Sequence, residues 1–130
     1  MGYTEVSVNR HGIRLTLIIS SMEMGGAERV LSLLANHWVS HGYEITLLLL
    51  TADKKSVYPL DSRIRINTLG VMSASTGLFG ASVSNVKRIR KLRNATRLTE
   101  PDIVLAFMTE TAVLSLLAMR GTGIPVLACE

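Results

Sequence analysis

The chain has 130 residues, of which 48% are hydrophobic and 18% charged, and its formal net charge at pH 7 is +4. This length is enough for one domain with a buried core but too short for two. The small positive charge admits phosphates, nucleic acid or anionic lipid as partners without choosing among them. Cys129 is the single cysteine, which excludes an internal disulfide and a cysteine-based zinc site and makes a reducing cytoplasm the expected compartment.

Residues 1–12 are mixed polar, and we expect a loose leader followed by one domain over 13–130. The leader carries no secretory signal pattern, and no apolar run reaches the ~20 residues of a membrane-spanning helix. The apolar run 13–20 predicts the first strand, and residues 27–39 show helical spacing. The apolar stripe of this predicted helix comprises Ala27, Val30, Leu31, Leu34, Ala35 and Trp38, with Arg29, Ser32, Asn36 and His37 on the opposite face.

The middle of the chain predicts two more strands. Residues 44–51 include four consecutive leucines at 47–50, which suit a strand buried on both faces. The polar stretch 52–63 is interpreted as a connection, and the alternation over 64–67 predicts a third strand near the sheet edge. Residues 70–84 are rich in Gly, Ser and Ala and have no period, so we expect a long loop there.

The last third of the chain predicts two helix–strand pairs. Residues 83–98 return to helical spacing, and 102–107 form the fourth strand. Residues 110–120 predict a short helix, and 125–129 predict the fifth strand. Strands alternating with helices in this way favour the α/β class and a doubly wound parallel sheet. In such sheets ligands bind at the carboxyl ends of the strands, near the switch in strand order.

A glycine turn joins the first predicted strand to the first predicted helix. Gly25 and Gly26 have no Cβ, so their backbone can come close to a ligand. The helix start that follows offers free N–H groups and partial positive charge to a phosphate. The alternative is a turn that only packing requires, because the dinucleotide and phosphate-loop glycine patterns are absent. Glu28 suits the helix dipole, and Arg29 either contacts an anion or faces solvent.

The helix predicted over 83–98 has a dense basic face. A solvated surface is the ordinary interpretation of such a face. The alternative is attraction to an anionic membrane, worth about 1 kcal/mol per basic residue near the surface. Nucleic acid is not expected as a partner, because no aromatic residues interleave with the basic ones and no known module is present. The basic residues are Lys87, Arg88, Arg90, Lys91, Arg93 and Arg97.

Several stretches together resemble the N-terminal domain of family 4 glycosyltransferases. The most specific is MEMGGAERV at 22–30, which LAN at 34–36 and HGYEITLL at 41–48 extend. Further along, RLTEPDIVLAF at 97–107 is similar to the family's approach to its fourth strand, and IPVLACE at 124–130 to the strand after that. The resemblance covers roughly residues 13–130.

The resemblance implies one Rossmann-like half of a two-domain GT-B enzyme, which transfers a sugar with retention of anomeric configuration. This half binds a glycan or lipid-linked acceptor, and the other half binds a UDP- or GDP-linked sugar as substrate. Gly25 and Gly26 map to contact with the donor diphosphate, and neither a metal nor another cofactor is expected. Glu28, Arg29 and Glu130 are candidate contacts to the acceptor or an anion. Lys87, Arg88 and Lys91 are candidate membrane contacts at the inner face of the cell membrane.

The chain also departs from the family. No two of its glutamates are seven residues apart, the spacing that the family uses at the donor site. The catalytic residues are therefore expected in a C-terminal half, and we expect the domain to be partial and inactive alone. The alternatives are a nonenzymatic nucleotide- or phosphate-binding module and an inert remnant. An exposed fifth strand would favour self-association.

Overall fold

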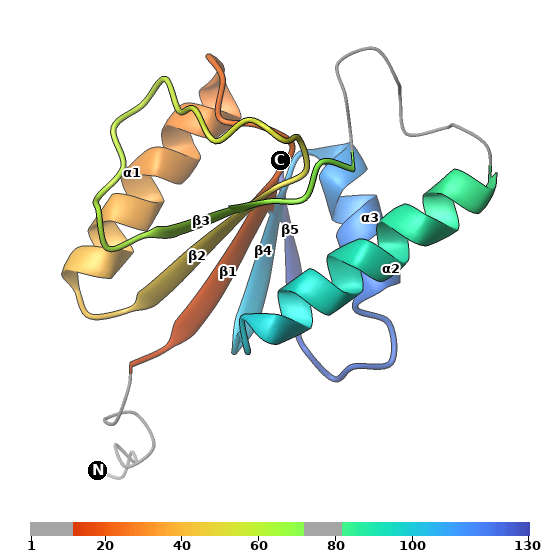
Figure 1. Cartoon of the computed structure of the whole chain (residues 1–130). Helices are drawn as coiled ribbons and strands as arrows, with labels where there is room; N and C mark the ends of the chain where they lie inside the picture. The colour runs from red at the N-terminus through yellow and green to blue at the C-terminus, as the bar shows by residue number, and fades with distance from the viewer. Residues whose placement is uncertain (1–11, 72–81) are drawn as a thin grey trace, which may run out of the picture.

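The computed structural model describes residues 12–71 and 82–130, so the predicted leader, apart from Gly12, and residues 72–81 of the predicted loop lie outside it (Figure 1). Each predicted strand and helix is present, and their bounds differ from the predicted ones by at most two residues. The elements are β1 (Arg14–Ile19), α1 (Gly26–Ser40), β2 (Glu44–Leu49), β3 (Arg65–Thr68), α2 (Ser82–Leu98), β4 (Ile103–Phe107), α3 (Thr109–Ala118) and β5 (Val126–Cys129).

The five strands form one parallel sheet in the order β3-β2-β1-β4-β5. β1 lies at the centre and pairs with β2 on one side and β4 on the other, so the strand order switches between β1 and β4. This is the Rossmann-like, doubly wound arrangement that the sequence predicts. The predicted edge position of the third strand is confirmed, because β3 pairs only with β2 among the described residues.

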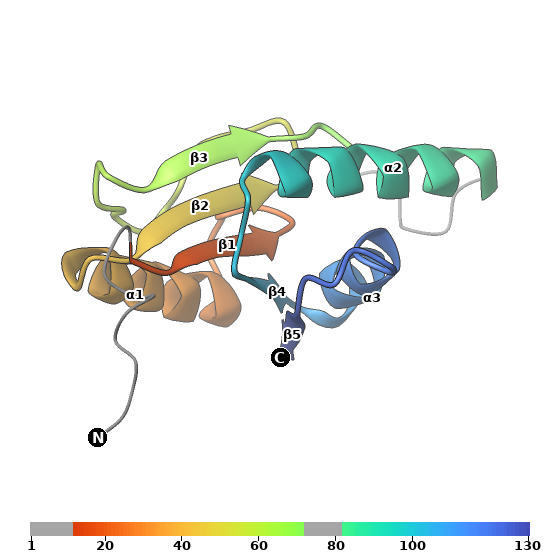
Figure 2. The same cartoon turned by 90° about the horizontal axis from the view of Figure 1, so that it is seen from below.

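Helices cover both faces of the sheet (Figure 2). On one face Leu17 and Leu47 pack with Leu31 of α1. On the other face Ile18 and Leu48 pack with residues of α2 and α3, among them Leu92 and Leu114. The four leucines at 47–50 are all fully buried, which confirms the predicted burial of this strand on both faces. Alternation of side chains along each strand therefore divides the apolar residues between two cores.

The buried stripe of α1 is rotated from the predicted one. Ser32, expected on the solvent face, is only 3% exposed, whereas Val30, expected in the stripe, is 50% exposed. The Ser32 hydroxyl donates to the Arg29 carbonyl at 2.7 Å, so its burial leaves no unsatisfied polar group. A small, satisfied side chain at this position lets the helix lie close to the sheet.

Candidate functional site

The glycine turn lies at the carboxyl edge of the sheet, between the end of β1 and the start of α1. Gly25 is the N-cap residue, with an extended backbone (φ 172°), and no side chain caps the helix. The Gly25 carbonyl accepts the hydrogen bond of Arg29 N at 3.1 Å. The first amides of a helix have no partner within the helix. The turn therefore presents backbone donors at the switch in strand order, where doubly wound sheets bind ligands.

Neither glycine is needed for its backbone conformation, because positive φ angles occur at other glycines and not at these two. A Cβ on Gly26 would meet no atom within 4 Å. A Cβ on Gly25 would collide with Glu28 Oε1, the end of a side chain that can move. Packing of the described residues thus gives no reason for glycine at position 26. An empty space beside the helix start is what close approach of a ligand requires.

Tyr58 holds the turn from the connection between β2 and β3. Its hydroxyl accepts a hydrogen bond from Gly25 N at 3.3 Å and donates one to Gly25 O at 3.1 Å. The connection is itself tied to the chain before the turn, because Val57 N donates to Met22 O at 3.0 Å. Sequence reasoning did not identify Tyr58, since a lone tyrosine in a polar connection carries no spacing signal. Tyr58 is a positioning residue for Gly25.

The two charged residues of the first helical turn differ in position. Glu28 is half-buried, and its carboxylate lies against Gly25. Arg29 is exposed. A negative side chain is favourable near a helix N-terminus. Glu28 therefore already occupies part of the space that an incoming anion would use, and the anion would have to displace it.

Met108 follows β4, the strand on the other side of the switch point. It is the N-cap residue of α3 and has φ 79° and ψ 147°. Residues other than glycine rarely adopt this backbone conformation. Its N–H donates to Cys129 O at 2.9 Å, which ties β4 to β5. Strained residues of this kind cluster at functional sites. Nothing in the sequence marked Met108, because a strained non-glycine residue has no compositional signature.

The other candidate residues are spread over the molecule. Glu130 is exposed and follows β5, two strands away from β1 at the same edge. Lys87 and Lys91 are exposed on α2, and Arg88 beside them donates to Asn85 Oδ1 at 3.3 Å. Because α2 covers the face opposite α1, the basic residues do not join the glycine turn in one site (Figure 2).

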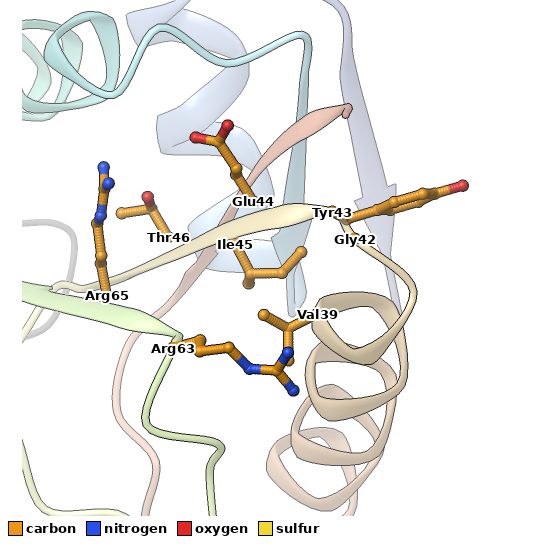
Figure 3. A pocket seen from close by; sticks show the side chains of 8 residues that line it. All are labelled: Val39, Gly42, Tyr43, Glu44, Ile45, Thr46, Arg63 and Arg65. Carbon is orange, nitrogen blue, oxygen red and sulfur yellow. The ribbon is translucent and has the colours of Figure 1, made fainter. Parts of the chain in front are cut away.

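Two cavities lie at the opposite, amino-terminal edge of the sheet. The larger, of about 270 Å³, is lined by Glu44, Arg63 and Arg65 among others (Figure 3). The smaller, of about 150 Å³, adjoins it and includes Arg14. Most of their charges are already paired, since Arg14 Nε lies 3.5 Å from Glu44 and Arg63 Nη2 2.9 Å from Asp61. We assign them a structural role, because ligands of such sheets bind at the carboxyl edge.

Metal ligands do not gather in the part of the chain that the structure describes. Within residues 12–71 and 82–130, no three His, Cys, Asp or Glu side chains lie together as a metal ion requires. Cys129 is half-buried at the end of β5, and burial raises the pKa of its thiol.

Comparison with known proteins shows which protein family the chain matches. Residues 25–130 match the glycosyl transferase 4-like domain. A relative from Campylobacter jejuni, GalNAc-alpha-(1->4)-GalNAc-alpha-(1->3)-diNAcBac-PP-undecaprenol alpha-1,4-N-acetyl-D-galactosaminyltransferase, is 26% identical over 118 residues. That match covers 91% of this chain and 32% of the relative.

Two solved structures share the fold. Sucrose-phosphate synthase from Thermosynechococcus elongatus superposes with a TM-score of 0.68 at 10% identity, over 89% of this chain and 32% of that one. Phytolacca americana UGT2, complexed with UDP-2-fluoro-glucose and pterostilbene, superposes with a TM-score of 0.61 at 19% identity, over 93% of this chain and 31% of that one. The chain thus spans about a third of the length of each of these proteins.

Proposed function

The chain belongs to the glycosyl transferase 4-like domain family, and on that premise we propose that it is the acceptor-side part of a retaining glycosyltransferase. The donor would be a UDP- or GDP-linked sugar and the acceptor a glycan or a lipid-linked glycan. The Campylobacter jejuni relative supports such an acceptor, because its name includes PP-undecaprenol. The Phytolacca americana structure supports a nucleotide-sugar donor, because it holds UDP-2-fluoro-glucose. The parallel sheet is the Rossmann-like half of a GT-B fold.

The glycine turn is the part of this chain to which the proposal assigns a role in the reaction. In sugar transfer the bond between the anomeric carbon and the diphosphate oxygen breaks, and a bond to the acceptor oxygen forms. Negative charge develops on the leaving diphosphate, so donors aimed at it lower the barrier. The uncapped helix start and the empty space beside Gly26 are the observation that carries the assignment of the Gly26 amide to this role. The Gly25 amide would exchange its hydrogen bond to the Tyr58 hydroxyl for one to the ligand. No cofactor besides the donor substrate is part of the proposal.

The catalytic residues belong, on this proposal, to sequence that the 130 residues do not include. The relatives are about three times as long as the matched region, which leaves room for a donor-binding half. We therefore expect the isolated chain to show no sugar transfer. A radiolabelled nucleotide-sugar assay with the purified chain measures this, and transfer without a partner polypeptide would contradict it.

An NMR titration of the ¹⁵N-labelled chain tests the diphosphate contact. Inorganic pyrophosphate, UDP and GDP are each added, and we expect the amide signals of Gly25, Gly26 and Ala27 to move at millimolar ligand. Gly26→Val should bind pyrophosphate roughly tenfold more weakly, because its side chain fills the space that the ligand needs. The fold should tolerate this change, because a Cβ at position 26 meets no neighbour.

Thr109→Val is the matched control, because Thr109 begins α3 as Gly26 begins α1 and is also exposed. Its pyrophosphate affinity should equal that of the wild type. Shifts confined to the cavity at the amino-terminal edge, or equal losses in both variants, would refute the assignment. Tight UDP or GDP binding by the chain alone would favour the nonenzymatic nucleotide-binding module instead.

We further propose that α2 contacts an anionic membrane through Lys87, Arg88 and Lys91, where a lipid-linked acceptor would lie. Lys87 and Lys91 are exposed on its outer side. None of the helices in the described ranges is long and apolar enough to span a bilayer, so the contact proposed is peripheral. Each basic residue near such a surface contributes about 1 kcal/mol.

Sedimentation with phosphatidylglycerol-containing vesicles tests the membrane contact. Binding should fall as salt is raised, and the triple variant K87Q/R88Q/K91Q should bind at least about tenfold more weakly. The matched control K54Q/K55Q/R65Q removes three charges from exposed positions on β3 and the connection before it. Equal losses in the two triple variants would show a net-charge effect and reject the specific surface.

A further inference from the structure

The connection between β2 and β3 runs along α1 and is tied to it at the start of the helix and further along (Figure 1). At the start, the Tyr58 hydroxyl makes two hydrogen bonds to the backbone of Gly25. Further along, the Asn36 side chain donates to Pro59 O at 2.9 Å and accepts from Asp61 N at 2.8 Å. The first tie therefore reaches the glycine turn, and the second does not.

The backbone that carries Tyr58 is held in place by contacts of its own. Val57 N donates to Met22 O at 3.0 Å, and Ser56 pairs with Met22 as a parallel bridge. Met22 is fully buried and so gives this end of the connection a fixed anchor. The Ser56 hydroxyl also donates to Tyr58 O at 2.7 Å. These contacts do not involve Asn36, so the Tyr58 hydroxyl is presented to the turn independently of the second tie.

The Tyr58 hydroxyl acts on the peptide bond that joins Gly25 to Gly26. This peptide group contains the Gly25 carbonyl and the Gly26 N–H, which point in opposite directions because a trans peptide is planar. The donor bond of 3.1 Å from the hydroxyl to the carbonyl therefore also fixes the direction of the Gly26 N–H. Two successive glycines leave their shared peptide group unusually free to rotate. A restraint on the carbonyl from outside the helix limits that rotation.

We propose that Tyr58 orients the Gly26 amide towards the diphosphate and so raises the affinity of the turn for it. This role rests on the proposed function, because it takes the diphosphate contact as its premise. A phosphate oxygen is a charged acceptor and forms the stronger bond, so it replaces the hydroxyl at Gly25 N, where the distance is 3.3 Å. An anion does not compete for the donor bond to Gly25 O, which therefore persists in the bound state. Tyr58 is thus a positioning residue that need not touch the ligand.

Tyr58→Phe tests this role, because it removes the hydroxyl and keeps the ring. In the free ¹⁵N-labelled chain we expect the backbone order parameter of the Gly26 amide to fall, whereas the amides of β1 keep theirs. Pyrophosphate should then bind the variant roughly fivefold more weakly than the wild type, because binding must also order the turn. The measurements are ¹⁵N relaxation without ligand and the Gly26 amide shift against pyrophosphate concentration.

Asn36→Ala is the matched control, because it also removes two hydrogen bonds between α1 and the connection but leaves the turn alone. It should keep the wild-type Gly26 order parameter and pyrophosphate affinity, whatever loss of stability urea denaturation shows. Equal affinity losses in the two variants would make Tyr58 a structural tie and refute the role. Tighter binding by Tyr58→Phe, or an unchanged Gly26 order parameter, would equally refute it. A wild-type chain that binds no pyrophosphate would instead refute the proposed diphosphate contact itself.

Discussion

At the scale of single residues, the glycine turn has two features with opposite effects on the binding of an anion. Gly26 keeps open a space that the fold does not need, while Glu28 places a carboxylate beside the same helix start. A turn built only for packing would not need glycine at position 26, since a Cβ there would meet no atom within 4 Å. The space is therefore better explained by an incoming group than by the fold. Glu28 would then act as a placeholder that the incoming anion displaces.

Glu28→Gln should strengthen pyrophosphate binding at the turn two- to fivefold, because the ligand no longer displaces or faces a like charge, an effect of roughly 0.3–1 kcal/mol. The measurement is the amide shift of Gly25 and Gly26 against pyrophosphate concentration. Glu44→Gln is the control, since it removes the same charge at the amino-terminal edge, beside Arg14. Equal strengthening in both variants would show that net charge alone is responsible.

Asp61 should stay ionised to unusually low pH. Hydrogen bonds from the Arg63 side chain and backbone lower the pKa of its carboxyl from 3.8 to about 2. A lowered folded-state pKa stabilises the protein fully above the unfolded value of 3.8, and this stabilisation is lost as the pH falls towards about 2. Carboxyl ¹³C shifts followed against pH measure the titration. Arg63→Gln should move the midpoint back towards 3.8, and an unchanged midpoint would exclude Arg63 as the cause.

At the scale of elements, periodicity predicted the helices and strands well but not the angular position of α1. Serine is a polar residue, so its position in the pattern predicts the solvent face for Ser32. The structure buries it, because its hydroxyl donates to the Arg29 carbonyl within the helix. Contacts between elements escaped prediction for a related reason. Tyr58 and Met108 act through hydrogen bonds to residues far along the chain, and no local spacing reports such bonds.

The same helix offers a direct test of its packing. Leu31→Ala should lower the free energy of unfolding by about 2–5 kcal/mol, because Leu31 is fully buried in the core beneath α1. Leu33→Ala should change it by no more than about 0.5 kcal/mol, since Leu33 is 60% exposed. Urea denaturation measures both values. Similar losses in the two variants would contradict the packing of α1 against the sheet through Leu31.

At the scale of the whole molecule, strand order follows from rules that the sequence already satisfies. The sequence alternates strands with helices, has one strand suited to burial on both faces and has a polar strand suited to the sheet edge. These three features together favour the doubly wound sheet. The carboxyl edge as the site of binding follows from that arrangement. What the sequence could not supply is how far apart the candidate residues lie. Glycine turn, basic helix and Glu130 prove to occupy different places on the sheet.

The sheet should open from its edges, and native-state hydrogen exchange can measure this. β1 is paired on both sides and lies between two cores, so the amides of Leu17 and Ile18 should exchange only through global unfolding. Asn67 on β3 has a partner strand on one side only and should exchange at least about tenfold faster. Exchange at Asn67 as slow as at Leu17 and Ile18 would contradict this order of opening.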